Sequence, residues 1–433
     1  MHLPTFASAL SEEDFKVALG EWISEELPEV RKRDTTLPLE PRNIVAVLGP
    51  RRAGKTSLLY YTISSYLKKG VPRRNILYID FEHPRLKNLK ADNLDSMLKS
   101  FYELSKPDPA FPIYLFLDEI QNVSDYGKWF RKRVNARVYI SGSSSKLSSM
   151  NVAEELRGRS VEYLVYPLSF KEFLLFKGLG VQEPELLLYN QRKRGVILSA
   201  MREYLRYGGY PAVVLERDER EKVRLLRSYF SSVVVRDFAY SNPALAEPFV
   251  KFLVQNYANL LSENRIYHYL RSLGFKVGKE KVLELFKTGI DSYFLFPLEL
   301  FAKSERRRRL NLRKFYIVDT GYPTALGYEF SIGKAMENCV MLELRRREKE
   351  VFYWKEYGKT LGKEVDFVVS KNGNPQELLQ VTYTGEGMHL REVSALHAAK
   401  EEMGTKSLTL ITWDEHGEKE DIKLVPLWYW LLK

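Results

Sequence analysis

Residues 43–67 contain the feature that most limits how this chain folds: an apolar run, a glycine-containing loop and a helical segment in direct succession. The run NIVAVL precedes the loop GPRRAGKT, and SLLYYTISSYL follows it. Glycines let backbone N–H groups approach phosphate oxygens, and a helix N-terminus adds partial positive charge. The order strand, loop, helix therefore predicts a phosphate-binding loop. The predicted nucleotide-binding residues are Gly49, Pro50, Arg51, Arg52, Ala53, Gly54, Lys55, Thr56 and Ser57.

Within this loop, Lys55 is expected to reach the β- and γ-phosphates of a nucleotide, and the Thr56 hydroxyl is expected to ligate Mg²⁺. A second apolar run, IYLFLDE, ends in two acids. Asp118 is placed to hold Mg²⁺ through water, and Glu119 is placed to polarise the attacking water. These residues predict ATP and Mg²⁺ as cofactors and Glu119 as the catalytic base.

Two further positions are candidates for sensing or completing the nucleotide site. Ser141 and Ser143 follow the next apolar run, where a hydroxyl can bond to the γ-phosphate; a plain serine-rich loop is the alternative. Arg157 and Arg159 precede the fifth run, and one of them can act as an arginine finger toward a neighbouring subunit. A surface salt bridge explains either arginine equally well.

The alternation of apolar runs and helical segments predicts an α/β core with a parallel sheet. Helical periodicity follows this core until the break at Gly208–Pro211, and then gives way to an α+β pattern. The expected segments are an N-terminal helical arm (1–40), the P-loop core (41–168), a helical lid (169–242), a winged helix (243–320) and a C-terminal α+β module (321–433).

The winged helix is inferred from three helices (247–261, 264–273 and 279–288) followed by a two-stranded hairpin with a basic tip. The formal net charge of the chain is +11, and residues 301–315 hold seven basic residues against one acidic residue. Such clustering favours a polyanionic partner, and we expect DNA. The expected DNA-binding residues are Lys279 and Lys281 on the third helix, and Arg306, Arg307, Arg308 and Arg309 at the tip.

Other features limit the compartment and the chemistry. Cys339 is the only cysteine, which excludes an internal disulfide and a cysteine-rich zinc site and favours a reducing cytoplasm. No apolar run approaches the roughly 20 residues that cross a bilayer, so no membrane partner is expected. His389 and His397 are spaced too loosely to predict a metal pair.

Taken together, GPRRAGKTS, YIDFEHPRL, LFLDEIQ, SGSSSKL, LRGRS before YPLSFKEFL, and YGGYP resemble the AAA-like P-loop ATPases of the archaeal and bacterial STAND-related branch. The later motifs VDTG, ENCVMLEL, KEVDFVV and ELLQV resemble the C-terminal region of that family. The resemblance implies a winged helix followed by a restriction-endonuclease-like domain over 321–433. It also favours Arg159 over Arg157 as the finger and implies a homo-oligomer, of which a hexameric ring is one form.

Restriction-type nucleases hold Mg²⁺ with carboxylates and assist the attacking water with a lysine. The matching positions of a nuclease-like site are Glu337, Asp366 and Gln380. Thr382 stands where the lysine is expected, and Lys363 or Glu377 would have to compensate. Both a cutting nuclease and a retained binding or structural fold therefore stay open.

Three functions are compatible with these observations. The first is an oligomeric ATPase acting on DNA through the winged helix. The second is a STAND-like switch, in which ATP controls assembly and hydrolysis only resets it. The third is an ATP-gated, Mg²⁺-dependent nuclease.

Overall fold

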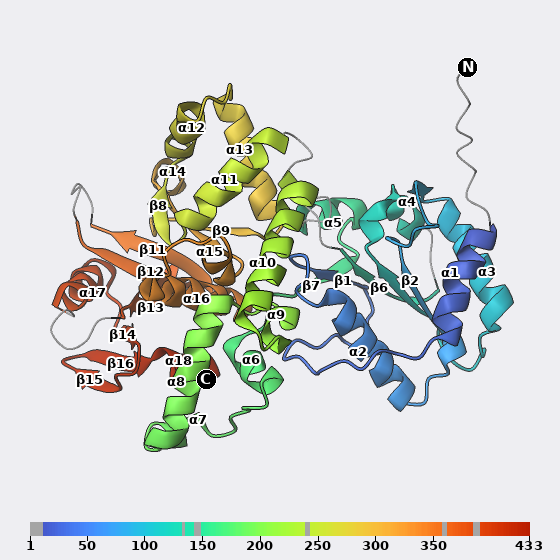
Figure 1. Ribbon diagram of the computed structural model, residues 1–433, viewed down its shortest axis with the longest axis horizontal. Helices are drawn as coiled ribbons and strands as arrows, with labels where there is room; N and C mark the ends of the chain where they lie inside the picture. Colours follow the sequence, from blue (N-terminus) through green and yellow to red (C-terminus); the bar gives the residue numbers. More distant parts are fainter. Residues whose placement is uncertain (1–11, 132–134, 143–148, 239–242, 357–361, 384–389) are drawn as a thin grey trace. The chain divides into compact units, whose positions relative to one another are not determined.

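The computed structural model describes residues 12–131, 135–142, 149–238, 243–356, 362–383 and 390–433 (Figure 1). The chain divides into two compact units, residues 1–165 and 166–433. Within the described ranges, no helix is long and apolar enough to cross a membrane.

The first unit is built on a five-stranded parallel sheet in the order β2-β4-β6-β1-β7. Its strands are continuous apolar runs, as expected when helices cover both faces of a sheet. The parallel sheet predicted from the apolar runs is confirmed, and it has five strands. They are β1 (Ile44–Leu48), β2 (Ile76–Asp80), β4 (Tyr114–Asp118), β6 (Arg137–Ser141) and β7 (Ser160–Leu164).

Helices and a small second sheet surround these strands. The N-terminal helix α1 belongs to the same packing, because the Trp22 indole donates a 2.9 Å hydrogen bond to the carbonyl oxygen of Ile76. Trp22 and Leu37 lie in one hydrophobic cluster with strand β1. The helices are α1 (Glu12–Ser24), α2 (Lys55–Lys68), α3 (Asn93–Ser105), α4 (Tyr126–Arg131) and α5 (Ser149–Leu156); the short strands β3 (Leu89–Lys90) and β5 (Val123–Ser124) pair in parallel.

The second unit begins with the helices predicted as a lid. Helix α8 packs against α15 and α16, and α10 packs against α15. These helices are therefore part of the core of the second unit, and a lid role stays a prediction. They are α6 (Phe170–Phe176), α7 (Pro184–Leu187), α8 (Gln191–Tyr207), α9 (Pro211–Leu215) and α10 (Glu219–Val233), which continues into a π-helical turn (Val234–Phe238).

The segment predicted as a winged helix contains three main helices and a three-stranded antiparallel sheet in the order β8-β10-β9. Two details differ from the expectation. A strand that was not predicted, β8, replaces the end of the predicted first helix. The arginine run forms a short helix instead of a bare hairpin tip. The elements are α11 (Pro243–Gln255), β8 (Asn259–Leu261), α12 (Glu263–Ser272), α13 (Lys279–Asp291), β9 (Leu295–Leu298), α14 (Glu305–Leu310) and β10 (Arg313–Ile317).

The C-terminal part is a mixed six-stranded sheet in the order β11-β12-β13-β14-β16-β15. Helix α17 covers one hydrophobic cluster of this sheet through Ala395, Leu396 and Ala399. The elements are α15 (Gly321–Ala325), α16 (Ile332–Arg346), β11 (Glu350–Lys355), β12 (Glu364–Lys371), β13 (Asn374–Val381), α17 (Leu390–Met403), β14 (Ser407–Thr412), β15 (Gly417–Lys419), β16 (Ile422–Pro426) and α18 (Leu427–Leu432).

Two sequence motifs that lie far apart in the chain meet inside the second unit. The Asp319 carboxylate, which follows β10, accepts hydrogen bonds from the backbone N–H groups of Gly209 (2.7 Å) and Gly321 (2.8 Å). Burial raises the pKa of Asp319 to about 7, although both N–H groups act in the opposite direction. Gly208 has a φ of 77°, and a β-carbon at this position would overlap the same carboxylate. This junction fixes the turn between α8 and α9.

Candidate functional site

The predicted phosphate-binding loop connects β1 to the N-terminus of α2. Gly49 has a φ of 140°, and a β-carbon there would collide with the carbonyl oxygen of Val165. The Lys55 ammonium donates hydrogen bonds to the carbonyl oxygens of Gly49 (3.0 Å) and Pro50 (2.9 Å), so it lies within the loop. The loop and its lysine thus have the compact arrangement that a phosphate cradle requires.

An arginine that the sequence did not single out supports this loop. The Arg33 guanidinium, which is buried, donates a 2.9 Å hydrogen bond to the carbonyl oxygen of Ala53. A guanidinium nitrogen of Arg51 lies 3.8 Å from a carboxylate oxygen of Glu82, the second residue after β2. Arg33 stands in the polar segment before the core, where no motif marks it, so only the packing of that segment reveals the contact.

Asp118 is the centre of a hydrogen-bonded group beside the loop. Its Oδ2 accepts from the Thr56 hydroxyl (2.7 Å) and the Tyr78 hydroxyl (3.1 Å), and its Oδ1 accepts from the Ser141 hydroxyl. Burial raises the pKa of Asp118, although the hydroxyls of Ser141 and Thr56 oppose this shift. Hydroxyl and carboxylate oxygens are the ligands that Mg²⁺ prefers, so Thr56 and Asp118 fit this cation.

Glu119 follows Asp118 in a left-handed conformation with a φ of 53°. Its backbone N–H is 3.2 Å from Asp118 Oδ1 and 3.4 Å from the Ser141 hydroxyl, and the Gln121 amide donates to its carboxylate. The turn therefore directs the two neighbouring acids differently: Asp118 bonds with Thr56, and Glu119 bonds with Gln121. Gln121 ends the motif LFLDEIQ, but no role was predicted for it.

Asp80 adds a third carboxylate at the same edge of the sheet. It ends β2 and lies opposite Asp118 in the strand register. Burial raises the pKa of Asp80 to about 6, and the negative charge of Asp118 acts in the same direction. The position of Asp80 at the end of an apolar run could have indicated this, because parallel strands bring their carboxyl ends to one edge of a sheet. Asp80 lies outside the phosphate-binding loop and the run IYLFLDE, from which the nucleotide site was predicted.

The structure places the predicted residues Ser141, Ser143 and Arg159 differently with respect to this group. Ser141 ends β6, the strand between β1 and β4, and reaches Asp118; Ser143 lies outside the described residues. The exposed Arg159 donates to the carbonyl oxygens of Phe130 and Arg131, both at 3.3 Å, in its own chain. Its action toward a neighbouring subunit stays a prediction.

In the second unit, the structure brings together the three residues of the predicted nuclease-like site. Asp366 on β12 receives a hydrogen bond from the backbone N–H of Val381 (3.0 Å), and the Gln380 side-chain oxygen accepts from the backbone N–H of Asp366 (3.0 Å). Glu337 on α16 and Asp366 both contact Lys314 of β10. These residues line a cavity of about 460 Å³.

The predicted DNA-binding residues are distributed over two helices. Lys279 is exposed at the start of α13, and Lys281 pairs with Glu284 at 2.8 Å. In α14, Arg306 is exposed, whereas Arg308 donates to the Ala302 carbonyl oxygen (2.6 Å) and its guanidinium lies 5.0 Å from the ring centre of Phe352. Arg307 is half-buried, and the Arg309 side chain lies outside the described part of the chain. The basic run is thus partly packed against the protein.

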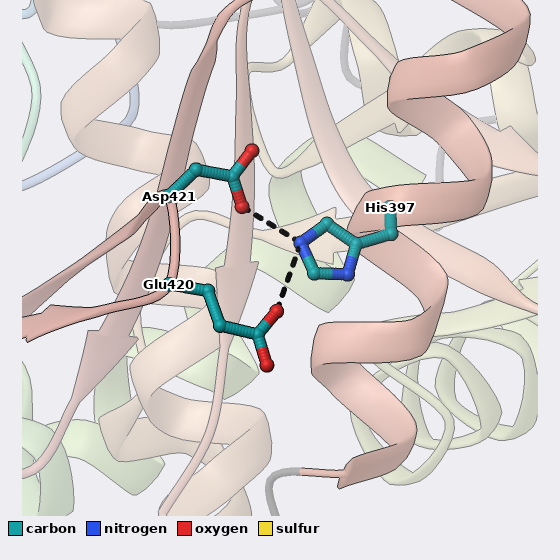
Figure 2. A group of neighbouring side chains, drawn as sticks. All are labelled: His397, Glu420 and Asp421. Atoms are coloured by element: carbon teal, nitrogen blue, oxygen red, sulfur yellow. Dashed lines mark hydrogen bonds and ion pairs between the residues drawn. The ribbon is translucent and has the colours of Figure 1, made fainter.

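Figure 2 shows His397 of α17 beside Glu420 and Asp421 of the β15–β16 turn. The His397 Nε2 atom is 2.8 Å from Asp421 and 3.6 Å from Glu420. The Lys400 ammonium occupies the other oxygen of Asp421, and with His397 it lowers the pKa of Asp421 to about 2. These contacts join His397, Lys400 and the two acids in one group at the surface.

Comparison with known proteins places this geometry in context. The AAA domain family matches residues 41–174, which contain the loop and both acids. The chain is 31% identical, over 97% of its length, to "Uncharacterized protein MJ1544" of Methanocaldococcus jannaschii, and the match covers 96% of that protein. The chain belongs to the same family as MJ1544. The AAA domain match confirms the predicted P-loop core of this chain.

A bacterial relative extends the MJ1544 family beyond archaea. It is an uncharacterized protein of Haemophilus influenzae, 30% identical over 76% of this chain and 80% of the relative. Two domain families of unknown function match residues 198–331 (DUF8612) and 332–430 (DUF4143).

Solved structures resemble the chain only distantly. The Walker-type ATPase PABY2304 of Pyrococcus abyssi is 15% identical, with 74% of this chain and 96% of that chain covered and a TM-score of 0.41. The Orc1 protein of Aeropyrum pernix, in complex with DNA, is 14% identical, with 75% and 93% covered and a TM-score of 0.29.

Proposed function

We propose that the chain binds and hydrolyses ATP with the site of its first unit and acts on DNA with its second. The observation that carries the ATPase proposal is the group of Thr56, Asp118 and Ser141 beside the P-loop, with Glu119 next in sequence. In this site, Lys55 faces the terminal phosphates, Thr56 and Asp118 hold Mg²⁺, and Glu119 accepts a proton from the attacking water. Bound Mg²⁺ would neutralise charge that develops on the phosphates.

The DNA proposal is supported by the order of elements from α11 to β10. Helix, strand, two helices and then two strands joined through the short helix α14, with β8 and β9 on either side of β10, are compatible with a winged helix. Helix α13 would then be the recognition helix, with Lys279 at its N-terminus. The basic residues of 303–309 lie between β9 and β10, where a wing would contact phosphates.

The most direct test is the ATP hydrolysis rate without nucleic acid and with single-stranded DNA, duplex DNA, branched DNA or RNA. Stimulation by DNA is expected if hydrolysis and DNA binding are coupled. Very slow turnover that no nucleic acid changes, together with ATP-dependent assembly, would instead identify the switch described above.

Neutralising three cations of the proposed DNA surface is expected to weaken duplex binding with little dependence on sequence. In a Lys279→Gln, Lys281→Gln, Arg306→Gln variant, the slope of log affinity against log salt should fall by roughly 0.9 for each phosphate that the protein no longer neutralises. Fluorescence anisotropy at several salt concentrations measures this slope. Lys371→Gln, at the exposed end of β12, is the matched control. Unchanged DNA binding with impaired self-association would show that these cations contact another protein surface.

Arg159 provides a test of assembly. If it acts on the nucleotide of a neighbouring subunit, Arg159→Ala is expected to bind ATP but to hydrolyse it poorly. Mixing this variant with Lys55→Ala should restore part of the turnover, because one variant supplies an intact nucleotide site and the other an intact arginine. Steady-state ATPase assays across mixing ratios measure the rescue. If the variants co-assemble and no rescue occurs, Arg159 acts within its own chain.

A further inference from the structure

Lys314 of β10 is buried among three carboxylates of the C-terminal part of the chain. Its ammonium lies 2.6 Å from Glu364, 2.9 Å from Asp366 and 3.0 Å from Glu337, and 4% of its side chain is exposed. Lys314 is one of the seven basic residues of segment 301–315, but it was not among the predicted DNA-binding residues. Its side chain points into the protein.

The three acids hold this ammonium through hydrogen bonds and an ion pair. Lys314 donates hydrogen bonds to Glu337 and Asp366, and Glu364 is a third carboxylate within 3.0 Å. Burial by itself would lower the pKa of Lys314, but attraction by Asp366 and Glu337 holds it well above its usual value. The lysine therefore stays charged and is the cationic partner of all three acids.

Other groups also engage several oxygens of the cluster. Asp366 bonds through its other oxygen to the Val381 N–H, and Glu337 Oε1, which faces Lys314, also accepts from the Tyr316 hydroxyl (2.7 Å). The Gln380 oxygen is held by the Asp366 N–H. A divalent cation at this point would have to displace the buried ammonium from its three acids, and a buried unpaired charge is very costly. The donor set present here does not fit a catalytic Mg²⁺.

We propose that Lys314 is the built-in cation of the Glu337–Glu364–Asp366 cluster and takes the position that a divalent metal holds in a metal-dependent nuclease. The cluster is then complete without metal and does not cleave phosphodiester bonds. This inference concerns only the second unit, so it is independent of whether the first unit hydrolyses ATP.

The first test uses the wild-type chain without nucleotide, titrated with Mn²⁺ and followed by electron paramagnetic resonance. Wild type, Asp366→Asn and Glu364→Gln are expected to bind the same amount of Mn²⁺, since none of it occupies the cluster. The three proteins are also expected to leave linear and circular DNA uncut in Mg²⁺ or Mn²⁺. A Mn²⁺ site or a cleavage activity that wild type has and either variant loses would overturn the proposal.

The second test removes the internal cation. In Lys314→Met, the three acids lose their partner, and this variant is expected to gain one Mn²⁺ site per chain. The double variant that carries both Lys314→Met and Asp366→Asn is expected to lack this site. Mn²⁺ should raise the melting temperature of Lys314→Met but not that of wild type. Lys363→Met, which removes another lysine from the same cavity wall, is the control and should gain no site. A folded Lys314→Met that binds no additional Mn²⁺ would contradict the proposal; if it does not fold, the wild-type comparison decides.

Discussion

Replacing Glu119 by glutamine is expected to slow ATP hydrolysis at least about 100-fold while nucleotide binding is retained. The amide keeps the shape of the side chain but cannot accept a proton from water. Asp118, Thr56 and the loop are unchanged by this substitution, and they hold the nucleotide and Mg²⁺. Single-turnover hydrolysis and binding of a fluorescent ATP analogue separate the two effects.

Two comparisons make this result specific to Glu119. Lys55→Ala should remove nucleotide binding itself, because Lys55 is the cation of the phosphate loop. Glu103→Gln, on the exposed surface of α3, should behave as wild type. Equal hydrolysis rates for wild type and Glu119→Gln would exclude Glu119 as the base and leave Asp80, at the same sheet edge, as the next carboxylate to examine.

Replacing Gly208 by alanine is expected to destabilise the second unit by roughly 3 kcal/mol. Two causes act together at this residue. Its φ of 77° disfavours a side chain, and a β-carbon would overlap the buried Asp319 carboxylate that fixes the turn. Urea unfolding of the full-length chain, followed by tryptophan fluorescence, should show an earlier transition for the second unit.

Gly195 offers a matched control in the helix that ends just before Gly208. It lies within α8, and a β-carbon there would meet no atom within 4 Å. Gly195→Ala should therefore increase stability by about 0.5–1 kcal/mol, because alanine loses less conformational freedom in a helix. If Gly208→Ala unfolds at the same urea concentration as wild type, the Asp319 junction contributes little to folding.

The sheet of the first unit could be predicted from sequence because each buried parallel strand is a continuous apolar run with a clear end. Strand β8 could not be separated from the helix before it, since the apolar pattern continues past Gln255 without a break. Its three residues become a strand only through pairing with Arg313, Lys314 and Phe315, more than fifty positions later. A local pattern does not contain that information.

The residues of the nucleotide site also fall into two groups: those whose role a local motif predicts, and those that only the packing of the chain brings to the site. Lys55, Thr56, Asp118 and Glu119 lie in short contiguous motifs whose spacing is set by local chemistry. Arg33, Tyr78 and Gln121 reach the site only through the packing of other elements. Tyr78 and Gln121 lie within YIDFEHPRL and LFLDEIQ, but these motifs do not show which side chains meet Asp118 and Glu119. The role of Lys314 could not be predicted for a related reason: its neighbours in sequence are basic, whereas its neighbours in space are acidic.

The position of Lys314 also bears on how these proteins can be recombined. Lys314 lies within the family region 198–331, and its three acids lie within the region 332–430. A chimera of two relatives joined between these regions would inherit the lysine from one parent and the acids from the other. Such a hybrid keeps its charge balance only if both parents carry the same arrangement, so the lysine and its acids should be exchanged as one unit.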